Sequence, residues 1–251
     1  MSEYQDIVKL WQSFNIQTVG DLEAYLDSFK VLFSYNSNKI ENANTTFEDT
    51  YEVFERGQVS SYTGDVRTLT EIQNAKVAYQ RLLRAFATRE SMTEGLLLEF
   101  QRLITEGTYD ERRVERGEKP GAYKQYHYVV GALETGAAPE TVAEEVGWLL
   151  DELNGAEIKA SDLLTAAAYF HAKFENIHPF ADGNGRTGRM LMNYFLILNN
   201  HPPVTIFEQD RIVYYQALDA FHSSQDLKPL REFLEQQMIK TWEKTLKRYG
   251  R

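Results

Sequence analysis

A twelve-residue stretch, HPFADGNGRTGR, runs from His178 to Arg189 and gathers several groups that can take part in chemistry. It holds one imidazole, one carboxylate, one side-chain amide, three glycines and two arginines. An imidazole titrates near neutral pH, so His178 can accept a proton from an attacking hydroxyl group. The glycines let the backbone turn tightly and approach a ligand. The stretch therefore predicts a catalytic base beside a ligand-binding loop.

The second half of this stretch is suited to binding phosphate. We expect a helix to begin near Arg186, and a helix N-terminus offers unpaired N–H groups and a positive dipole end. Arg186 and Arg189 are three residues apart and share one face of the first turn. Asp182 can hold Mg²⁺, which often uses one or two protein carboxylates and bridges phosphate oxygens. Together these groups predict phosphoryl or nucleotidyl transfer, in which positioning and charge neutralisation supply most of the catalysis.

Each of these groups also has an ordinary structural interpretation. A histidine before proline is often structural, an Asp-Gly pair is usually a turn, and arginines in a first helical turn are often solvated. All of them converge here on one helix start, and this convergence favours the chemical interpretation.

The segments on both sides of the stretch are predicted to be helices. Residues 161–177, SDLLTAAAYFHAKFENI, show apolar residues at helical spacing, with His171 on the apolar stripe as a core histidine. Residues 189–200, RMLMNYFLILNN, are apolar nearly all round, which is typical of a helix at the centre of its domain. Pro179 discourages His178 from continuing the first helix.

The rest of the chain is also predicted to be mainly helical, with one exception. GAYKQYHYVVGA, residues 121–132, is rich in aromatic and β-branched residues and bounded by glycines, so we expect a short β-hairpin or flap there. The predicted fold class is all-α: a helical bundle around a central buried helix, with a small β-hairpin flap. We expect residues 1–60 to form an N-terminal helical region and residues 61–251 to form the core domain with the C-terminal helices, as one compact unit.

Composition excludes several classes of function. The chain has 251 residues, 43% of them hydrophobic, which is enough for one well-buried core. It has no cysteine, so disulfides and thiolate metal sites are excluded. Its net charge of −10 argues against a nucleic-acid partner. The N-terminus lacks the pattern of a signal peptide, and no apolar run approaches the roughly 18 residues that a membrane span needs. We expect a soluble, cytoplasmic protein without a membrane partner.

The stretch from His178 to Arg189 resembles a known family. It matches the Fic motif, HPF-x-D/E-GN-G/K-R-x-x-R, at every specified position. The flap and the two flanking helices are also similar to those of Fic proteins, and the resemblance covers roughly residues 34–235. It implies the Fic fold and transfer of AMP from ATP to a Ser, Thr or Tyr hydroxyl of a protein. Doc toxins, the phosphotransferase branch, carry Lys where this chain has Gly185, so Gly185 fits the AMP-transferring branch.

The resemblance also implies roles for individual residues. His178 would be the base, and Asp182 would hold Mg²⁺ against the α- and β-phosphates of ATP. Arg186 would contact the β- or γ-phosphate, and Arg189 the γ-phosphate. Asn184 and the backbone amides from Gly183 to Gly185 would cradle the α-phosphate. Further nucleotide contacts are expected from Thr187, Gly188, Tyr214, Tyr215, His222 and the backbone of Val130, Gly131, Ala132 and Leu133. His222 stands where some relatives have Asn, so the base specificity stays open.

A second motif lies upstream, in SNKIEN at residues 37–42. Ser37 and Glu41 are one helical turn apart and share a face. The segment resembles the inhibitory motif S/T-x-x-x-E-G/N of self-inhibited Fic proteins. This resemblance implies that Glu41 pairs with Arg189 and excludes a productively bound γ-phosphate, while Ser37 supports the helix that presents Glu41.

Three functions remain open from the sequence. The first is a self-inhibited protein adenylyltransferase, with a target segment docked on the flap at residues 121–132 and with self-modification. The second uses the same site in reverse, with Glu41 positioning a water that removes AMP from a modified protein. The third is a non-catalytic nucleotide-sensing module, against which His178 and Asp182 argue, because a pure binder needs no base. Small Fic proteins often self-associate, so a homo-oligomer is a further expectation.

Overall fold

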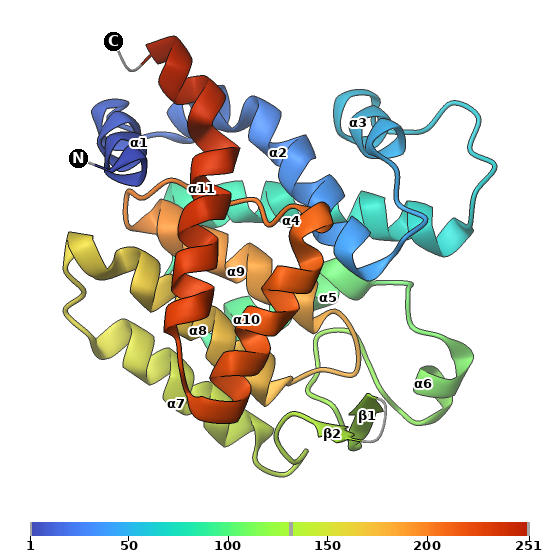
Figure 1. Cartoon of the computed structure of the whole chain (residues 1–251). Coiled ribbons are helices and arrows are strands. Elements are labelled where there is room, and N and C mark those ends of the chain that lie inside the picture. Colours follow the sequence, from blue (N-terminus) through green and yellow to red (C-terminus); the bar gives the residue numbers. More distant parts are fainter. Residues whose placement is uncertain (1, 131–132, 250–251) are drawn as a thin grey trace.

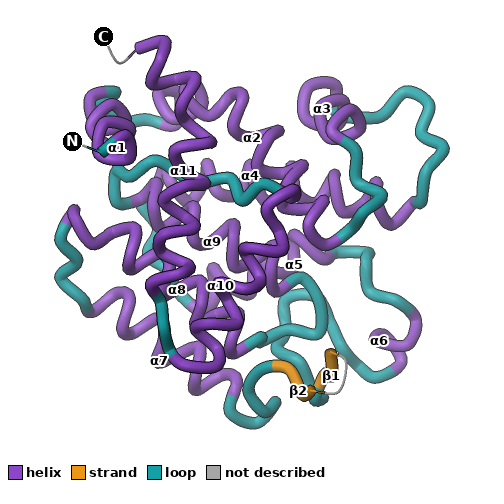
Figure 2. The backbone as a smooth tube through the Cα atoms, viewed as in Figure 1, coloured by secondary structure: helices purple, strands orange, loops and turns teal. Residues whose placement is uncertain are grey.

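The computed structural model describes residues 2–130 and 133–249, and helices dominate it (Figures 1 and 2). The helices are α1 (Glu3–Ser13), α2 (Val19–Glu41), α3 (Phe47–Arg56), α4 (Val66–Thr88), α5 (Glu94–Thr105), α6 (Glu111–Glu115), α7 (Val142–Gly155), α8 (Leu163–Ile177), α9 (Asn184–Leu198), α10 (Arg211–Ser224) and α11 (Lys228–Tyr249). Two short 3₁₀ turns, Ala160–Asp162 and Glu208–Asp210, precede α8 and α10. The predicted helical fold class is confirmed.

Helix α9 lies at the centre of the molecule (Figure 1). All its residues from Arg186 to Ile197 are buried, and it packs against α8, α5, α4 and α2. This burial follows from the sequence, because a helix that is apolar nearly all round must be covered on every side. The prediction of a central buried helix after the motif loop is confirmed.

Helix α2 carries the upstream motif to the same region. Thr18 caps its N-terminus in a capping box with Asp21, and Phe29, Phe33 and Ile40 are among its buried residues. It packs against α3, α4 and α9. Its last residue is Glu41, so the glutamate sits where the helix ends beside the start of α9.

One hydrophobic core runs from α1 to α11. The two ends of the chain meet within it, because α1 packs on α11 and Trp11 meets Trp242 edge to face with ring centroids 5.2 Å apart. The boundary predicted near residue 60 stays a prediction.

Two short strands, β1 (Tyr128–Val130) and β2 (Leu133–Thr135), lie beside the motif loop (Figures 1 and 2). They are antiparallel, with Tyr128 opposite Thr135 and Val130 opposite Leu133. Gly131 and Ala132, which the sequence places in the flap, lie outside the described residues.

Both flanks of this strand pair are tied to the loop after α8. Lys124 N–H donates to Pro179 O at 2.9 Å, and Ala137 N–H donates to Ile177 O at 2.9 Å. At Gly136, which has φ +83°, a Cβ atom would lie 2.5 Å from both the His178 Cβ and Ile177 O. Only glycine fits this close approach, so the sequence itself sets the strands next to His178.

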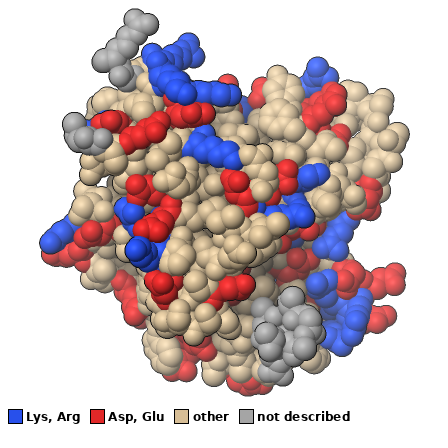
Figure 3. Space-filling view, in the orientation of Figure 1, with Lys and Arg blue, Asp and Glu red and all other residues tan. Residues whose placement is uncertain are grey.

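Within the described residues, no helix is long and apolar enough to cross a membrane. On the face drawn in Figure 3, Lys and Arg side chains lie among Asp and Glu side chains, and no continuous basic patch is visible among the residues coloured there.

Candidate active site

The motif loop joins α8 to α9 through two residues with left-handed backbone conformation. Helix α8 ends at Ile177, and His178, with φ 47°, is its C-cap and donates its N–H to Phe174 O at 2.9 Å. This ending agrees with the effect predicted for Pro179. Gly183, with φ 81°, is the N-cap of α9, and a Cβ there would come within 2.5 Å of Thr105 on α5. The loop is therefore held tightly between the two helices and α5.

Helix α9 begins at Asn184, two residues before the predicted start near Arg186. The reason lies in the Asn184 side chain, whose Oδ1 accepts from Phe180 N–H at 2.9 Å and whose Nδ2 donates to Phe180 O at 2.8 Å. Both ends of this buried amide are used to fix the loop. The Asn184 side chain therefore shapes the loop, while its backbone N–H, at the first turn of α9, has no intrahelical partner. The contact of Asn184 with the α-phosphate stays a prediction.

A cavity of about 260 Å³ opens over this loop. Its lining comes from α2, α6, β1, the loop and the first turn of α9, and comprises Glu41, Arg113, Tyr128, His178, Ala181, Asp182, Gly183, Asn184, Gly185 and Arg186. The structure therefore brings the predicted base, the predicted metal ligand and the predicted inhibitory glutamate to one cavity.

His178 is half-buried beside this cavity. Burial and the nearby Lys124 ammonium lower the pKa of His178 to about 4, although Glu41 and Asp182 oppose the shift. The imidazole is therefore neutral at physiological pH, which is the form that can accept a proton.

Arg189 is buried one turn into α9 and is held by α2. Its Nη2 donates to Glu41 Oε1 at 2.8 Å and to Ser37 O at 2.9 Å, and its Nε donates to Ser37 Oγ at 3.0 Å. Ser37 was expected only to support the helix that presents Glu41, whereas it binds Arg189 directly. Arg189 Nη1 is buried and has no hydrogen-bond partner among the described residues.

The Glu41 carboxylate lies directly against the first turn of α9. A Cβ placed on Gly185 would overlap Glu41 Oε1, so glycine is what admits the carboxylate there. The first N–H groups of a helix have no intrahelical partner and attract anions. Glu41 thus occupies the position where these groups would meet a phosphate, with 34% of its side chain still exposed.

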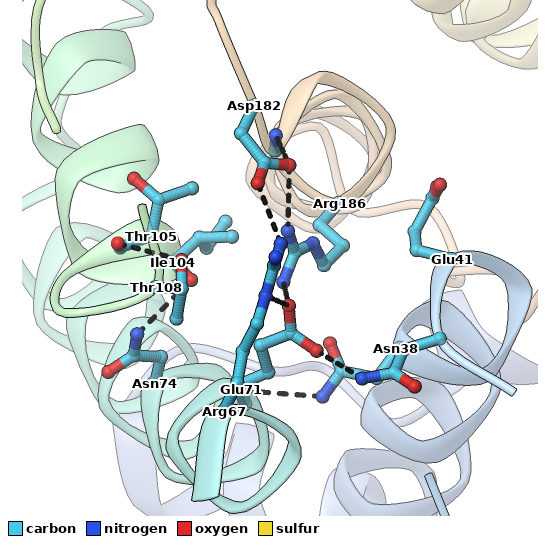
Figure 4. A network of polar contacts seen from close by, with 12 residues as sticks. Asn38, Glu41, Arg67, Glu71, Asn74, Ile104, Thr105, Thr108, Asp182 and Arg186 are labelled. Carbon is cyan, nitrogen blue, oxygen red and sulfur yellow. Dashed lines mark hydrogen bonds and ion pairs between the residues drawn. The ribbon is translucent and has the colours of Figure 1, made fainter. Parts of the chain in front are cut away.

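The Asp182 carboxylate is surrounded by donors from three segments (Figure 4). Its Oδ1 accepts from Gly183 N–H at 2.7 Å and from Arg186 Nη2 at 3.2 Å, and its Oδ2 accepts from Arg67 Nη2 at 2.9 Å. Arg186 is buried and also pairs with Glu71 at 3.2 Å. Arg67 and Arg186 therefore already neutralise the predicted metal ligand.

The residues at this point fit a Mg²⁺ ion that arrives with a nucleotide. The described residues contain no group of three or more His, Asp or Glu side chains that would hold a metal by themselves. Mg²⁺ commonly keeps several waters and binds through one carboxylate plus substrate phosphates. Asp182, facing the cavity and already paired with cations, has the chemistry of such a single ligand.

Several predicted nucleotide contacts are not brought to this cavity. Thr187 is fully buried, and Gly188 packs against α8, where a Cβ would lie 2.9 Å from Phe174 and 3.0 Å from His171. These two residues face the core because the buried helix has already begun. Their expected contacts with the nucleotide stay predictions.

The aromatic residues predicted for the base pocket lie on α10, with different surroundings. Tyr214 is 1% exposed, and its hydroxyl pairs with His171 Nε2 at 2.7 Å, so it is a core residue behind Arg189. This pairing supports the interpretation of His171 as a core histidine. Tyr215 is 42% exposed, and the exposed His222 bonds Asn176 Oδ1 at 3.1 Å. The nucleotide contacts expected of Tyr214, Tyr215 and His222 stay predictions.

Four residues of the site were missed by the sequence interpretation. Arg67 and Glu71 come from α4, Arg113 from α6 and Tyr128 from β1. Arg113 Nε donates to Ala181 O at 3.2 Å and so supports the loop. The i,i+4 spacing of Arg67 and Glu71 signalled a pair, but no local pattern indicated that the pair reaches Asp182.

Comparisons with known proteins agree with this geometry. Over nearly its whole length the fold matches a Fic domain containing signaling protein from Bacteroides thetaiotaomicron VPI-5482, with TM-score 0.80, 24% identity and coverage of 99% of this chain and 97% of that chain. It also matches Fic-1 from C. elegans, with TM-score 0.77, 24% identity and coverage of 99% of this chain and 71% of that chain. The architecture is thus the Fic fold.

Sequence comparison gives the family. Residues 91–196 match the model of the Fic/DOC family. The chain is 30% identical over 200 residues to protein adenylyltransferase fic-1 of Caenorhabditis briggsae and 31% identical over 201 residues to protein adenylyltransferase Fic of Drosophila willistoni. These alignments cover 79% and 80% of this chain and 38% of each relative. The chain belongs to the Fic/DOC family, and it spans under two fifths of the length of these curated relatives.

Proposed function

We propose that this chain is a protein adenylyltransferase that moves AMP from ATP to a Ser, Thr or Tyr hydroxyl of a target protein, and that Glu41 holds it inactive. The observation that carries the proposal is the 2.8 Å bond between Glu41 and Arg189, placed against a loop that also presents His178. The relatives named protein adenylyltransferase support the same chemistry.

The reaction follows from the groups around the cavity. Neutral His178 accepts the proton of the target hydroxyl, and that oxygen forms a bond to the α-phosphorus of ATP. The bond from the α-phosphorus to the bridging oxygen of the β-phosphate breaks, and pyrophosphate leaves. The first N–H groups of α9 and the Arg186 guanidinium stabilise the negative charge on the phosphate oxygens. Mg²⁺ held by Asp182 would neutralise further charge on the phosphates when it is bound.

Inhibition follows from competition for one guanidinium. A carboxylate and a γ-phosphate cannot both occupy the same face of Arg189, and Glu41 now occupies it. Arg189 Nη1, buried without a partner among the described residues, remains as a donor for a phosphate oxygen. With Glu41 in place, ATP is excluded from the orientation that exposes its α-phosphate to the target hydroxyl.

The β1–β2 pair is where we expect the target segment to dock. The two strands form a sheet by themselves, so each has an outer edge that can pair with an extended peptide. Tyr128 on β1 lines the cavity, which puts this edge beside His178. A segment added to the sheet would present its hydroxyl to the base.

Removal of AMP from a modified protein is a second candidate, because Glu41 lines the same cavity as His178. A carboxylate at this position can orient a water toward a bound phosphodiester. Incubation of modified target with Mg²⁺ and without ATP separates the two directions, because only the reverse reaction then releases AMP.

The direct test is transfer of label from ATP labelled with ³²P at the α or the γ position, run in parallel on the unmodified chain and on Glu41→Gly. Label from the α position in protein, absent in the Glu41→Gly/His178→Ala double variant, is the expected result. Label from the γ position would mean phosphorylation and would overturn the proposal.

A further inference from the structure

Arg67, in the first turn of α4, makes a long-range contact with the motif loop. Its Nη2 pairs with Asp182 Oδ2 at 2.9 Å across 115 residues of sequence, and its Nε pairs with Glu71 Oε1 at 3.2 Å. Figure 4 shows Arg67 between Asp182 and Glu71, with Glu41 on a different helix and outside this network. The contact is therefore separate from the bond between Glu41 and Arg189.

Glu71 is a fixed anchor for this arginine. Its side chain is 4% exposed, its Oε1 also pairs with Arg186 at 3.2 Å, and its Oε2 accepts from Asn42 Nδ2 at 2.8 Å. Arg67, by contrast, is 43% exposed. Its guanidinium can leave Asp182 and keep its bond to Glu71 without opening the core.

The two oxygens of Asp182 differ in how firmly they are held. Oδ1 is bound by the Gly183 N–H of the tight loop and by the buried Arg186. Oδ2 is bound by the half-exposed Arg67 alone among the residues that the structure describes. A cation arriving from solvent therefore meets Oδ2, and the group that it must displace is the Arg67 guanidinium.

We propose that Arg67 is a displaceable counter-ion of Asp182, a positioning residue that occupies the place of the divalent cation and thereby sets the affinity of the site for that cation. The inference rests on the proposed function, in which Asp182 binds the metal that accompanies ATP. Two side chains of the protein then stand where ligand groups would bind. Glu41 takes the place of a phosphate anion, and Arg67 takes the place of the metal cation.

This arrangement has a specific consequence for metal binding. Arg67 opposes the cation by occupying Oδ2 and by placing a positive charge next to it. Exposed ion pairs are weak, so removing Arg67 should tighten cation binding by about two- to fivefold. Glu41 acts on the anion instead, so the two contacts are open to separate tests.

The experiment measures binding of Mn²⁺ in the presence of a saturating, non-transferable ATP analogue, by water-proton relaxation enhancement at fixed ionic strength. The analogue is needed because Asp182 offers a single carboxylate and the nucleotide phosphates supply the other ligands. Arg67→Gln should lower the Kd by about two- to fivefold, and Arg67→Lys, which keeps the charge, should lie between it and the unmodified chain. Arg56→Gln is the matched control, because it removes an arginine that pairs with Glu52 on the exposed face of α3 and should leave the Kd unchanged. If Arg67→Gln melts early, Arg67→Met replaces it.

Asp182→Asn separates failure of this inference from failure of the proposed function. If Asp182→Asn removes Mn²⁺ binding and Arg67→Gln leaves the Kd unchanged or raises it, the inference is overturned while the metal site stands. If Asp182→Asn binds Mn²⁺ as well as the unmodified chain does, the metal lies elsewhere and both the metal assignment and the inference are overturned.

Discussion

Replacing Glu41 by glycine removes the carboxylate that occupies Arg189. The structure shows one charge-assisted hydrogen bond between them, at 2.8 Å. Such bonds contribute about 1.5–3 kcal/mol, and the 34% exposure of Glu41 places this one at the low end of that range. Because about 1.4 kcal/mol corresponds to tenfold in an equilibrium constant, we expect AMP transfer to rise about tenfold or more. Ser37 keeps two hydrogen bonds to Arg189, so the arginine stays in place for the γ-phosphate.

The assay is incorporation of label from α-³²P-ATP, including self-modification, at equal protein concentration. Arg189→Ala added to the Glu41→Gly chain should lose the gain, because the γ-phosphate then has no anchor. Glu41→Gln serves as the matched control for side-chain size, and it should release the enzyme less, because an amide still accepts a hydrogen bond. Unchanged transfer in a Glu41→Gly chain that remains folded and binds ATP would refute this reasoning.

Three further predictions concern the base, the strands and the buried histidines. His178→Ala in the released chain should lower transfer at least about a hundredfold while nucleotide binding is kept, since general-base catalysis contributes roughly 10²–10⁴-fold; a loss within threefold would remove His178 from this role. Val129→Pro should impair modification of a target more than ATP binding, because proline removes the N–H with which the outer edge of β1 would pair with an added strand; equal loss of both in filter-binding and transfer assays would argue against docking there. Burial lowers the pKa of His171 to about 3 and that of His178 and His201 to about 4. Below pH 6.5 the unfolded chain therefore binds more protons than the folded chain, so the free energy of unfolding should fall as the pH falls from about 6.5 toward 4. Burial raises the pKa of Glu175 to about 7, which offsets one of the three histidines. The two remaining groups, at about 1.36 kcal/mol each, leave a net loss of roughly 2.7 kcal/mol in the free energy of unfolding per pH unit near pH 5.5, measured by urea unfolding, and a flat profile would contradict the burial of the histidines.

The sequence predicted the parts of the fold that local patterns encode. The end of α8 at Ile177 follows from Pro179, and the burial of α9 follows from its apolar residues on every face. The start of α9 was predicted two residues late, because a side-chain amide and a left-handed glycine extend the helix, and neither is visible in apolar periodicity.

The site was less predictable where contacts join distant segments. Glu41 was placed on Arg189 only through the resemblance of SNKIEN to an inhibitory motif, since 148 residues separate the two side chains. No motif indicated Arg67, although its contact with Asp182 also joins distant segments, with 115 residues between the two side chains. Thr187 and Gly188 were assigned to the nucleotide because they lie inside the motif, and only the structure shows that Thr187 is fully buried and that Gly188 packs against α8.

The intact mass of the released chain tests most directly whether this protein transfers AMP and is restrained by Glu41. The Glu41→Gly chain is incubated with ATP and Mg²⁺ and its intact mass is compared with that of the same chain carrying His178→Ala. We predict an increase equal to one or more AMP groups in the first chain and no change in the second. An increase equal to phosphate groups, or the same AMP increase in both chains, would contradict the account.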